Sequence, residues 1–347
     1  MGKNIVCFID SFNSGGAQKQ MVMLANGLCA TNKVKTLQYH DLNFFSEFLN
    51  KSIFQYKVLM TNKFSRIFGI LKVLYKENPD IIIAFLTGPN NYAALYKMIF
   101  FWRKTTLIVG ERNLNINKLT TRDFIIRFSH LIANSVVCNS NAQKNILQKV
   151  FGEKVSFIPN GTIMDNIEVK NITNSNYNLI VPGRFINQKN PMGLLKAIKY
   201  LPNVHVYWYG EIFKEYDIYK ECIDLIQKND IDNFHFKGPT NDIYSKMLKY
   251  DALILPSFYE GCPNAIIDAM LVGLPVLASN VSDNKIYLEH QKEFLFDPNN
   301  TDDIQRTIKL FYNTDIKRLK EISNNNIIKA KIFFNPEIMV INYIKLF

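Results

Sequence analysis

The stretch DALILPSFYEGCPNAIIDAMLVGLPVLAS, residues 251–279, contains a complete strand–helix–strand pattern. Its ends, DALILP (251–256) and PVLAS (275–279), are short and almost wholly apolar, which is typical of buried parallel strands. Between them NAIIDAMLV has helical spacing, with Asn264 as a candidate N-cap and Gly273 as the C-terminal stop. The stretch therefore predicts a parallel α/β sheet.

The same alternation runs through both halves of the chain and predicts parallel sheets covered by helices on both faces. The further expected strands are residues 4–10, 34–40, 80–86, 105–111, 135–140, 177–183, 204–210 and 234–238, with helices at 18–30 and 191–201. A chain of 347 residues is longer than a single core usually grows, so we expect two Rossmann-like domains, joined near the polar run 160–176. Ligands of such sheets bind beyond the carboxyl ends of the strands, here in a central cleft between the domains.

Composition indicates a folded protein of a reducing compartment. Apolar residues make up 48% of the chain and charged residues 20%, and the apolar runs are too short to span a bilayer. The opening MGKNIVCFIDSF predicts a first strand and not a cleavable secretory segment. The five cysteines have neither paired spacing nor a histidine set beside them, so we expect a cytosolic protein without structural zinc.

The positive charge lies in the first half. Residues 1–160 hold 20 Lys and Arg against 8 Asp and Glu, whereas residues 161–347 hold 21 against 22. Nucleic acid and an anionic membrane face are both partners for such a half. Since no helix-turn-helix, zinc-finger or RNP-type signature accompanies the charge, we expect no nucleic acid. NYAALYKMIFFWRK (91–104) mixes aromatic and basic residues as interfacial segments do, although an amphipathic helix covering the sheet would look the same.

Three loops carry residues suited to binding an anion or a sugar. Gly15 and Gly16 separate the first strand from a helix, where backbone N–H groups can approach an anion, although a plain turn also uses glycine. In VPGRFINQKNP (181–191) Arg184 and Lys189 follow a strand and suit a diphosphate, although a solvated basic loop is the alternative. In the third loop Glu260 precedes a helix that contains Asp268, where acids can simply match the helix dipole.

Taken together, the motifs resemble a known family. The order is a GG loop, the PNG turn of VSFIPNGTIMD (155–165), G-R-x4-K, P-S-x-x-E-G-x-P and a helix with a second acid before G-x-P-V. This order resembles the retaining GT-B glycosyltransferases of family four (glycosyl transferases group 1), over nearly the whole chain. Within the family the run 11–28 is similar to the subgroup that builds bacterial surface polysaccharides and lipid-linked glycans.

The resemblance implies the following fold and site. The fold would be GT-B, with an acceptor-binding domain at 1–165, a nucleotide-sugar-binding domain at 166–335, and a C-terminal helix at about 336–347 that packs back on the first domain. Arg184 and Lys189 would hold the diphosphate and Glu260 the donor-sugar hydroxyls. The other donor-binding positions would be Gly15, Gly16, Gly183, Gly261, Cys262, Pro263, Asn264, Asp268 at the ribose, and Pro239 and Thr240 in the loop that reads the base.

Three departures from the family pattern stand out. Asp268 replaces the usual glutamate and is one methylene shorter. The loop after PVLAS has no acid at the matching place, about Ile286. The usual histidine of the first domain is replaced by Arg112, so that Arg112 and Asn113 become candidate contacts of the acceptor or donor sugar.

The resemblance also implies the reaction. A sugar would pass with retention from a nucleotide donor, most commonly a UDP-sugar, to a glycan acceptor linked to undecaprenyl diphosphate, at the inner face of the plasma membrane. The leaving diphosphate can itself accept the acceptor's proton, so neither a cofactor nor a catalytic metal is expected. A sugar-nucleotide epimerase on the same fold and a non-enzymatic sugar-nucleotide-binding subunit are the alternatives.

Overall fold

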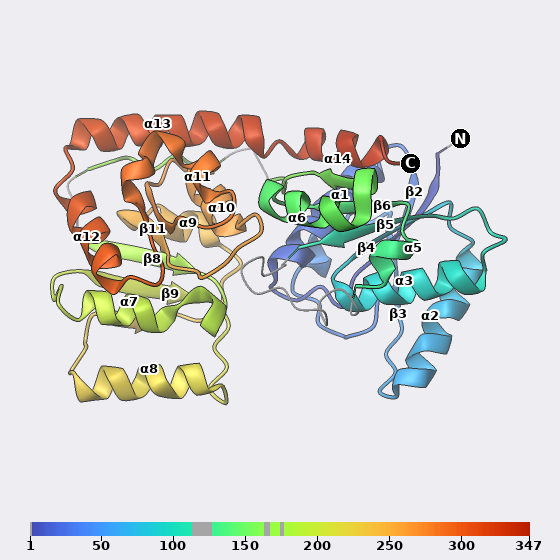
Figure 1. Ribbon diagram of the computed structural model, residues 1–347, viewed down its shortest axis with the longest axis horizontal. Coiled ribbons are helices and arrows are strands. Elements are labelled where there is room, and N and C mark those ends of the chain that lie inside the picture. Colours follow the sequence, from blue (N-terminus) through green and yellow to red (C-terminus); the bar gives the residue numbers. More distant parts are fainter. Residues whose placement is uncertain (1, 113–126, 163–166, 174–176) are drawn as a thin grey trace. The chain divides into compact units, whose positions relative to one another are not determined.

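The computed structural model describes residues 2–112, 127–162, 167–173 and 177–347 (Figure 1). The chain divides into two compact units, residues 1–162 with 334–347 and residues 163–333. The expected boundaries after 165 and 335 lie within three residues of the observed ones. Asn113 lies outside the described residues.

Unit 1 is a parallel sheet in the order β3-β2-β1-β4-β5-β6-β7. Its strands are β1 (Asn4–Phe8), β2 (Lys33–Gln38), β3 (Phe54–Lys57), β4 (Ile81–Phe85), β5 (Thr106–Glu111), β6 (Ser135–Cys138) and β7 (Val155–Phe157). Its helices include α1 (Gly16–Leu28), α2 (Lys63–Glu77), α3 (Thr87–Ile99), α5 (Ser129–Ile132), α6 (Asn141–Phe151) and the C-terminal α14 (Pro336–Ile344). The chain end thus packs on the first unit.

Alternation along the central strands divides the core of unit 1 into two layers. Ile5 and Cys7 of β1 share one apolar cluster with α1 and α14, in which Met339 and Tyr343 of α14 are buried. Val6 and Phe8 face the other way, into a cluster with α2, α3 and α6. The period of two along a strand accounts for this division, because successive side chains point to opposite faces.

Unit 2 is a parallel sheet in the order β10-β9-β8-β11-β12-β13. Its strands are β8 (Asn178–Pro182), β9 (His205–Tyr209), β10 (Phe234–Phe236), β11 (Ala252–Leu255), β12 (Val276–Ser279) and β13 (Leu295–Phe296). Its helices include α7 (Pro191–Ile198), α8 (Asp217–Lys228), α9 (Ile243–Met247), α10 (Asn264–Leu271), α11 (Asn284–Tyr287), α12 (Thr301–Tyr312) and α13 (Ile316–Phe333). One apolar cluster joins the sheet to α7, α8 and α12, and α10 packs against α13.

The structure confirms the two parallel α/β sheets and corrects two details. The N-cap of α10 is Pro263 and not Asn264, which is the first helical residue. The expected stop at Gly273 is confirmed. Gly273 follows α10 with φ +72°, the left-handed conformation of a helix stop, and a Cβ there would meet Ser323. The sequence pattern also did not indicate the edge strands β3 and β13, which are short.

Candidate functional site

The carboxyl ends of β8 and β11 bring together the two motif loops of unit 2. Gly183 follows β8, where its N–H donates to Tyr209 O at 2.8 Å and its carbonyl accepts from Trp208 Nε1 at 2.7 Å. Farther along the same loop, Gln188 holds the loop after β11: Phe258 N donates to Gln188 O, and Gln188 Nε2 donates to Tyr259 O, both at 2.9 Å. These bonds fix the two loops against each other at one edge of the sheet.

Lys189 and Glu260 form an ion pair across these loops. Lys189 Nζ lies 2.5 Å from Glu260 Oε1, and both side chains are largely buried. Lys189 ends a short 3₁₀ turn, Asn187–Lys189, immediately before the Asn190 cap of α7. The sequence predicted both residues as site residues but not that they would pair. A cation and a carboxylate are therefore held together in the same small volume, where they can bind phosphate oxygens and sugar hydroxyls.

Arg184 lies on the same loop but is exposed. It borders a cavity of ≈ 560 Å³ together with Tyr259, Phe213 and Tyr216. The rings of Phe213 and Tyr216 stack with their centroids 4.9 Å apart. Burial raises the pKa of Tyr259, the neighbouring Glu260 carboxylate adds to the rise, and Arg184 opposes it. The guanidinium is thus close to the Glu260 loop and accessible to a ligand.

The loop after Glu260 leads into the N-terminus of α10. Gly261, Cys262 and Pro263 are buried, and Gly261 O accepts from Ser282 Oγ at 3.2 Å. The proline ring offers no oxygen with which to cap the helix. Backbone N–H groups at a helix start attract anions, so this end of α10 suits a phosphate held beside Lys189.

Asp268 is buried one turn into α10, and Tyr244 Oη of α9 donates to its Oδ1 at 2.9 Å. Tyr244 directly follows the loop that contains Pro239 and Thr240, where Asp242 N donates to Thr240 Oγ1 at 3.2 Å. Nothing in the sequence pattern indicated Tyr244, because the residues are 24 positions apart and belong to different helices. The contact brings the predicted base loop and the predicted ribose acid into one cluster.

In unit 1 the paired glycines begin α1. Gly15 is its N-cap and Gly16 its first residue. A Cβ at Gly15 would lie 2.1 Å from Gln18 Oε1, so glycine leaves room for Gln18, whose Nε2 donates to Asp10 Oδ1 at 3.0 Å. The glycine loop is therefore built around this contact at the end of β1.

Arg112, at the end of β5, is deeply buried, with 7% of its surface exposed. Its guanidinium lies 3.7 Å from the Phe85 ring centroid and donates to Asn160 Oδ1 at 3.1 Å and Tyr343 Oη at 2.5 Å. Burial raises the pKa of Tyr343, and the Arg112 charge opposes that rise. These contacts join β5, the PNG turn and α14 within unit 1, so Arg112 has a structural role in that unit. Contact with a sugar stays a prediction.

Comparison with known proteins identifies the family. Residues 163–329, almost all of unit 2, match the family model "Glycosyl transferases group 1". Among solved structures, Anabaena Alr3699/HepE in complex with UDP and glucose superposes with a TM-score of 0.85 at 18% identity, over 99% of this chain and 98% of that one. A sucrose-phosphate synthase from Thermosynechococcus elongatus gives 0.82 at 14% identity, again over 99% and 98%.

Two curated relatives are more similar in sequence. An undecaprenol-linked-glycan alpha-1,4-N-acetyl-D-galactosaminyltransferase of Campylobacter jejuni is 26% identical over 76% of this chain and 75% of its own. The Escherichia coli UDP-Gal:alpha-D-GlcNAc-diphosphoundecaprenol alpha-1,3-galactosyltransferase is 26% identical over 57% and 56%. With the fold and the paired site loops, these matches show a GT-B glycosyltransferase whose residues 163–329 match the group 1 family.

Proposed function

We propose that the protein transfers a sugar, with retention of configuration, from a UDP-sugar to a glycan linked to undecaprenyl diphosphate. The Lys189–Glu260 pair at the start of α10 carries the proposal, because it combines a phosphate-binding cation with a sugar-binding carboxylate. The Campylobacter and Escherichia relatives are named for acceptors of this lipid class, and the latter for a UDP-sugar. The proposed reaction would serve polysaccharide or glycan assembly.

The proposed chemistry assigns one role to each group. The bond from the anomeric carbon to the diphosphate oxygen breaks, and the bond to the acceptor oxygen forms on the same face of the sugar. The acceptor proton passes to the departing diphosphate, so no protein base is required. Arg184 and Lys189 stabilise the negative charge that develops on the leaving group, while Glu260 orients the sugar. Gly15 and Gly16 would approach the donor diphosphate and the acceptor, and neither a metal nor a cofactor is part of this scheme.

We further propose that unit 1 docks on the inner, anionic face of the plasma membrane. In the described residues, no helix is long and apolar enough to cross a membrane. The docking surface, which we call the α2 surface, consists of α2 and the turn after α3. Phe64 and Phe68 project one turn apart from α2, with 76% and 71% of their surface exposed, and Phe101 and Trp102 of the turn are 79% and 59% exposed.

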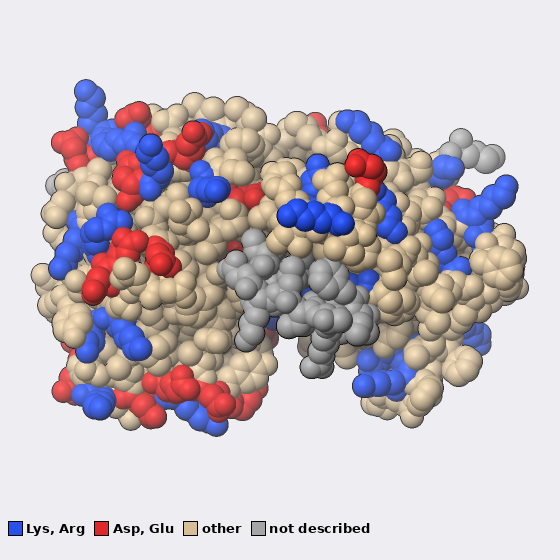
Figure 2. All heavy atoms as spheres, viewed as in Figure 1, with Lys and Arg blue, Asp and Glu red and all other residues tan. Residues whose placement is uncertain are grey.

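The two parts of the α2 surface are joined. Tyr75 of α2 packs against Phe100, with centroids 5.0 Å apart, and Arg103 Cζ lies 4.0 Å from the Tyr75 ring centroid. The same elements also expose lysines, namely Lys63, Lys72, Lys76 and Lys104. Figure 2 shows basic side chains gathered over α2, whereas acidic and basic residues intermingle over α8 of unit 2. Exposed aromatic residues together with exposed lysines are typical of a protein surface that binds anionic lipid.

The segment 91–104 is divided by the structure. Its helical part belongs to α3, which buries Ala93, Ala94 and Tyr96 on the sheet. Only the turn after α3 exposes aromatic residues, and α2 supplies the remainder of the surface. The alternative of a helix that covers the sheet therefore describes α3, and an interfacial role is proposed for the turn.

One experiment tests the transfer directly. Purified protein is incubated with a panel of labelled UDP-sugars and undecaprenyl-diphosphate-linked glycans, with and without EDTA. We expect one donor to give a product with an α linkage, unaffected by EDTA. An inverted linkage or EDTA inhibition would contradict the mechanism. A free C2-inverted sugar would indicate an epimerase, and donor binding without turnover a binding subunit.

A further inference from the structure

Unit 2 contains a second cavity, of ≈ 220 Å³, at the edge of the sheet opposite to the motif loops. Asp251 directly precedes β11 and Pro275 directly precedes β12, so the cavity lies at the amino-terminal ends of these strands. Lys170, Ile172, Thr173, Phe311, Tyr312, Thr314, Ile316 and Leu319 complete the lining. β11 has four residues, which at about 3.3 Å each separate the two edges by about 13 Å.

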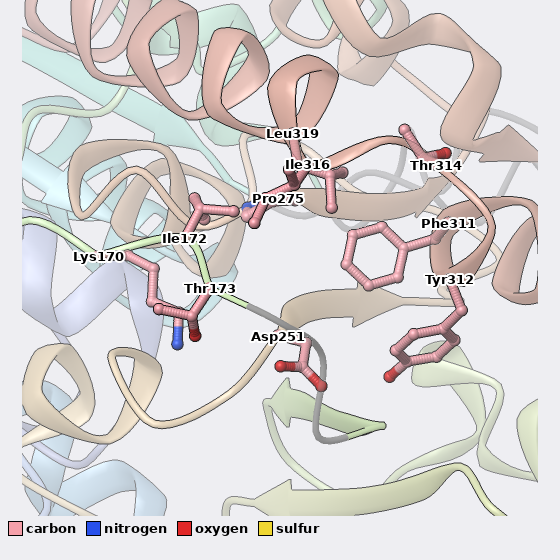
Figure 3. Close-up of a pocket in the computed structure, with 10 residues that line it drawn as sticks. All are labelled: Lys170, Ile172, Thr173, Asp251, Pro275, Phe311, Tyr312, Thr314, Ile316 and Leu319. Carbon is pink, nitrogen blue, oxygen red and sulfur yellow. The ribbon is translucent and has the colours of Figure 1, made fainter.

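The walls of this cavity differ in character (Figure 3). Ile172, Pro275, Ile316, Leu319 and the Phe311 ring form an apolar side. The polar side is formed by Lys170, Thr173, Asp251 and the hydroxyl of Tyr312, which is turned toward the side where Asp251 lies. A ligand for this cavity therefore needs an apolar face and a hydrogen-bonding edge.

Among the residues that line the cavity, Tyr312 gives the strongest indication of a bound ligand. Its hydroxyl is buried and has no hydrogen-bond partner among the described residues. Burial and the nearby Asp251 carboxylate raise its pKa, so the hydroxyl keeps its proton. A buried hydroxyl without a partner costs about 1–3 kcal/mol, which a ligand with a hydrogen-bonding group would recover.

Lys170 and Asp251 make the polar wall electrically balanced. Lys170 Nζ donates to Leu248 O at 2.8 Å, and Asp251 Oδ2 accepts from Asn178 N at 2.8 Å. An ammonium group has three donors, so Lys170 can bind a further partner, and Asp251 places a carboxylate in the same wall. The wall offers donors and acceptors side by side without net charge, which favours a neutral ligand whose groups both donate and accept.

We propose that this cavity binds a single neutral sugar ring, as a site separate from the nucleotide-sugar loops. Each hydroxyl of a pyranose both donates and accepts, matching the mixed polar wall, and its C–H face matches the apolar wall. The volume equals about seven water molecules at about 30 Å³ each, which is the scale of one sugar ring and not of a nucleotide. The cavity would hold a glycan residue or free monosaccharide at the edge of unit 2 remote from Lys189.

Saturation-transfer NMR with methyl α-D-galactopyranoside and methyl α-D-glucopyranoside tests this inference. Excess UDP is present throughout to occupy the nucleotide loops. We expect saturable binding of at least one glycoside, weakened about fivefold to tenfold in Tyr312→Phe and lost in Ile316→Trp, which fills the cavity. Tyr200→Phe, at an exposed tyrosine of the same unit, is the matched control and should bind as wild type.

The design separates this site from the proposed transfer reaction. Lys189→Ala should bind the glycoside normally whether or not it transfers sugar. Tyr312→Phe should melt no lower than wild type, because it removes a hydroxyl that lacks a partner. The inference is overturned if neither glycoside binds saturably in the presence of UDP, or if both cavity variants bind as wild type does.

Discussion

Lys189 Nζ and Glu260 Oε1 lie 2.5 Å apart, with 15% and 8% of their side chains exposed, although the residues are 71 positions apart in the chain. Removing one partner of a buried ion pair leaves the other charge uncompensated, which costs about 3–5 kcal/mol. Removing either partner should therefore lower the stability of the fold as well as affect the proposed chemistry. Stability has to be measured beside activity in every variant at these positions.

Arg184→Ala and Lys189→Ala should differ in stability but agree in catalysis. Both should lower kcat by about 10²–10³, since each cation would act mainly as charge develops on the leaving group. Only Lys189→Ala should also lower Tm, because it strands Glu260, whereas Arg184 is exposed. Steady-state kinetics with calorimetry on both variants checks this. A change confined to donor KM would contradict the leaving-group role.

Glu260→Gln should abolish transfer while nucleotide binding survives. The amide can still accept from Lys189, so the loop should keep its geometry. The lost charge would weaken contacts to the donor sugar but not to UDP itself. Calorimetric titration with UDP, beside a transfer assay, measures both. Equal loss of UDP affinity and transfer would mean that Glu260 is a structural residue of the loop.

The motif loops were predictable from sequence because each consists of consecutive residues after a buried strand. Gly183 to Lys189 and Glu260 to Pro263 follow β8 and β11, whose apolar runs are readable without a structure. The Lys189–Glu260 and Tyr244–Asp268 contacts were not predictable, because they depend on how separate loops and helices pack. The same holds for Arg112, whose partners Asn160 and Tyr343 lie 48 and 231 positions away.

Arg112→Ala should markedly lower the free energy of unfolding of unit 1. The substitution removes the hydrogen bonds to Asn160 Oδ1 and Tyr343 Oη and the cation from the Phe85 ring, so we expect a loss of about 2–4 kcal/mol. Tyr343→Phe removes one of these bonds and should cost less, about 1 kcal/mol. Denaturant unfolding measures both. An unchanged Arg112→Ala stability with reduced kcat would instead favour a direct sugar contact.

The α2 surface should direct the protein to anionic vesicles. Phe64→Ser with Phe68→Ser should weaken binding to phosphatidylglycerol vesicles about tenfold per residue, if each ring contributes about 1.5 kcal/mol in the interface. Flotation at low and high salt measures the affinity, and salt should weaken it because exposed charges are screened.

Ile332→Ser provides the control for the vesicle experiment. Ile332 is 64% exposed on α13 of unit 2, so its exposure is similar to that of the α2 phenylalanines. Its substitution should leave flotation unchanged. Equal flotation on neutral and anionic vesicles, or no loss in the double phenylalanine variant, would rule out the α2 surface as the docking site.

Asp268 should affect donor binding and not the chemical step. A carboxylate near the ribose would hold the donor equally in the ground and transition states, which changes KM and leaves kcat alone. Asp268→Ala should therefore weaken donor binding by about 1–2 kcal/mol, the scale of a charge-assisted hydrogen bond. Asp268→Glu, with the family's usual residue, should be tolerated or tighten binding.

A Tyr244 variant separates the effect of Asp268 on stability from its effect on donor binding. Asp268→Ala also removes the acceptor to which the Tyr244 hydroxyl donates at 2.9 Å, so Tm should fall in the single variant. Adding Tyr244→Phe removes that hydroxyl and should restore part of the Tm, while the raised donor KM persists. Melting and donor titration on the single and double variants measure the two quantities. A donor KM that stays at the wild-type value while Tm falls would show that Asp268 serves the fold and not the ribose.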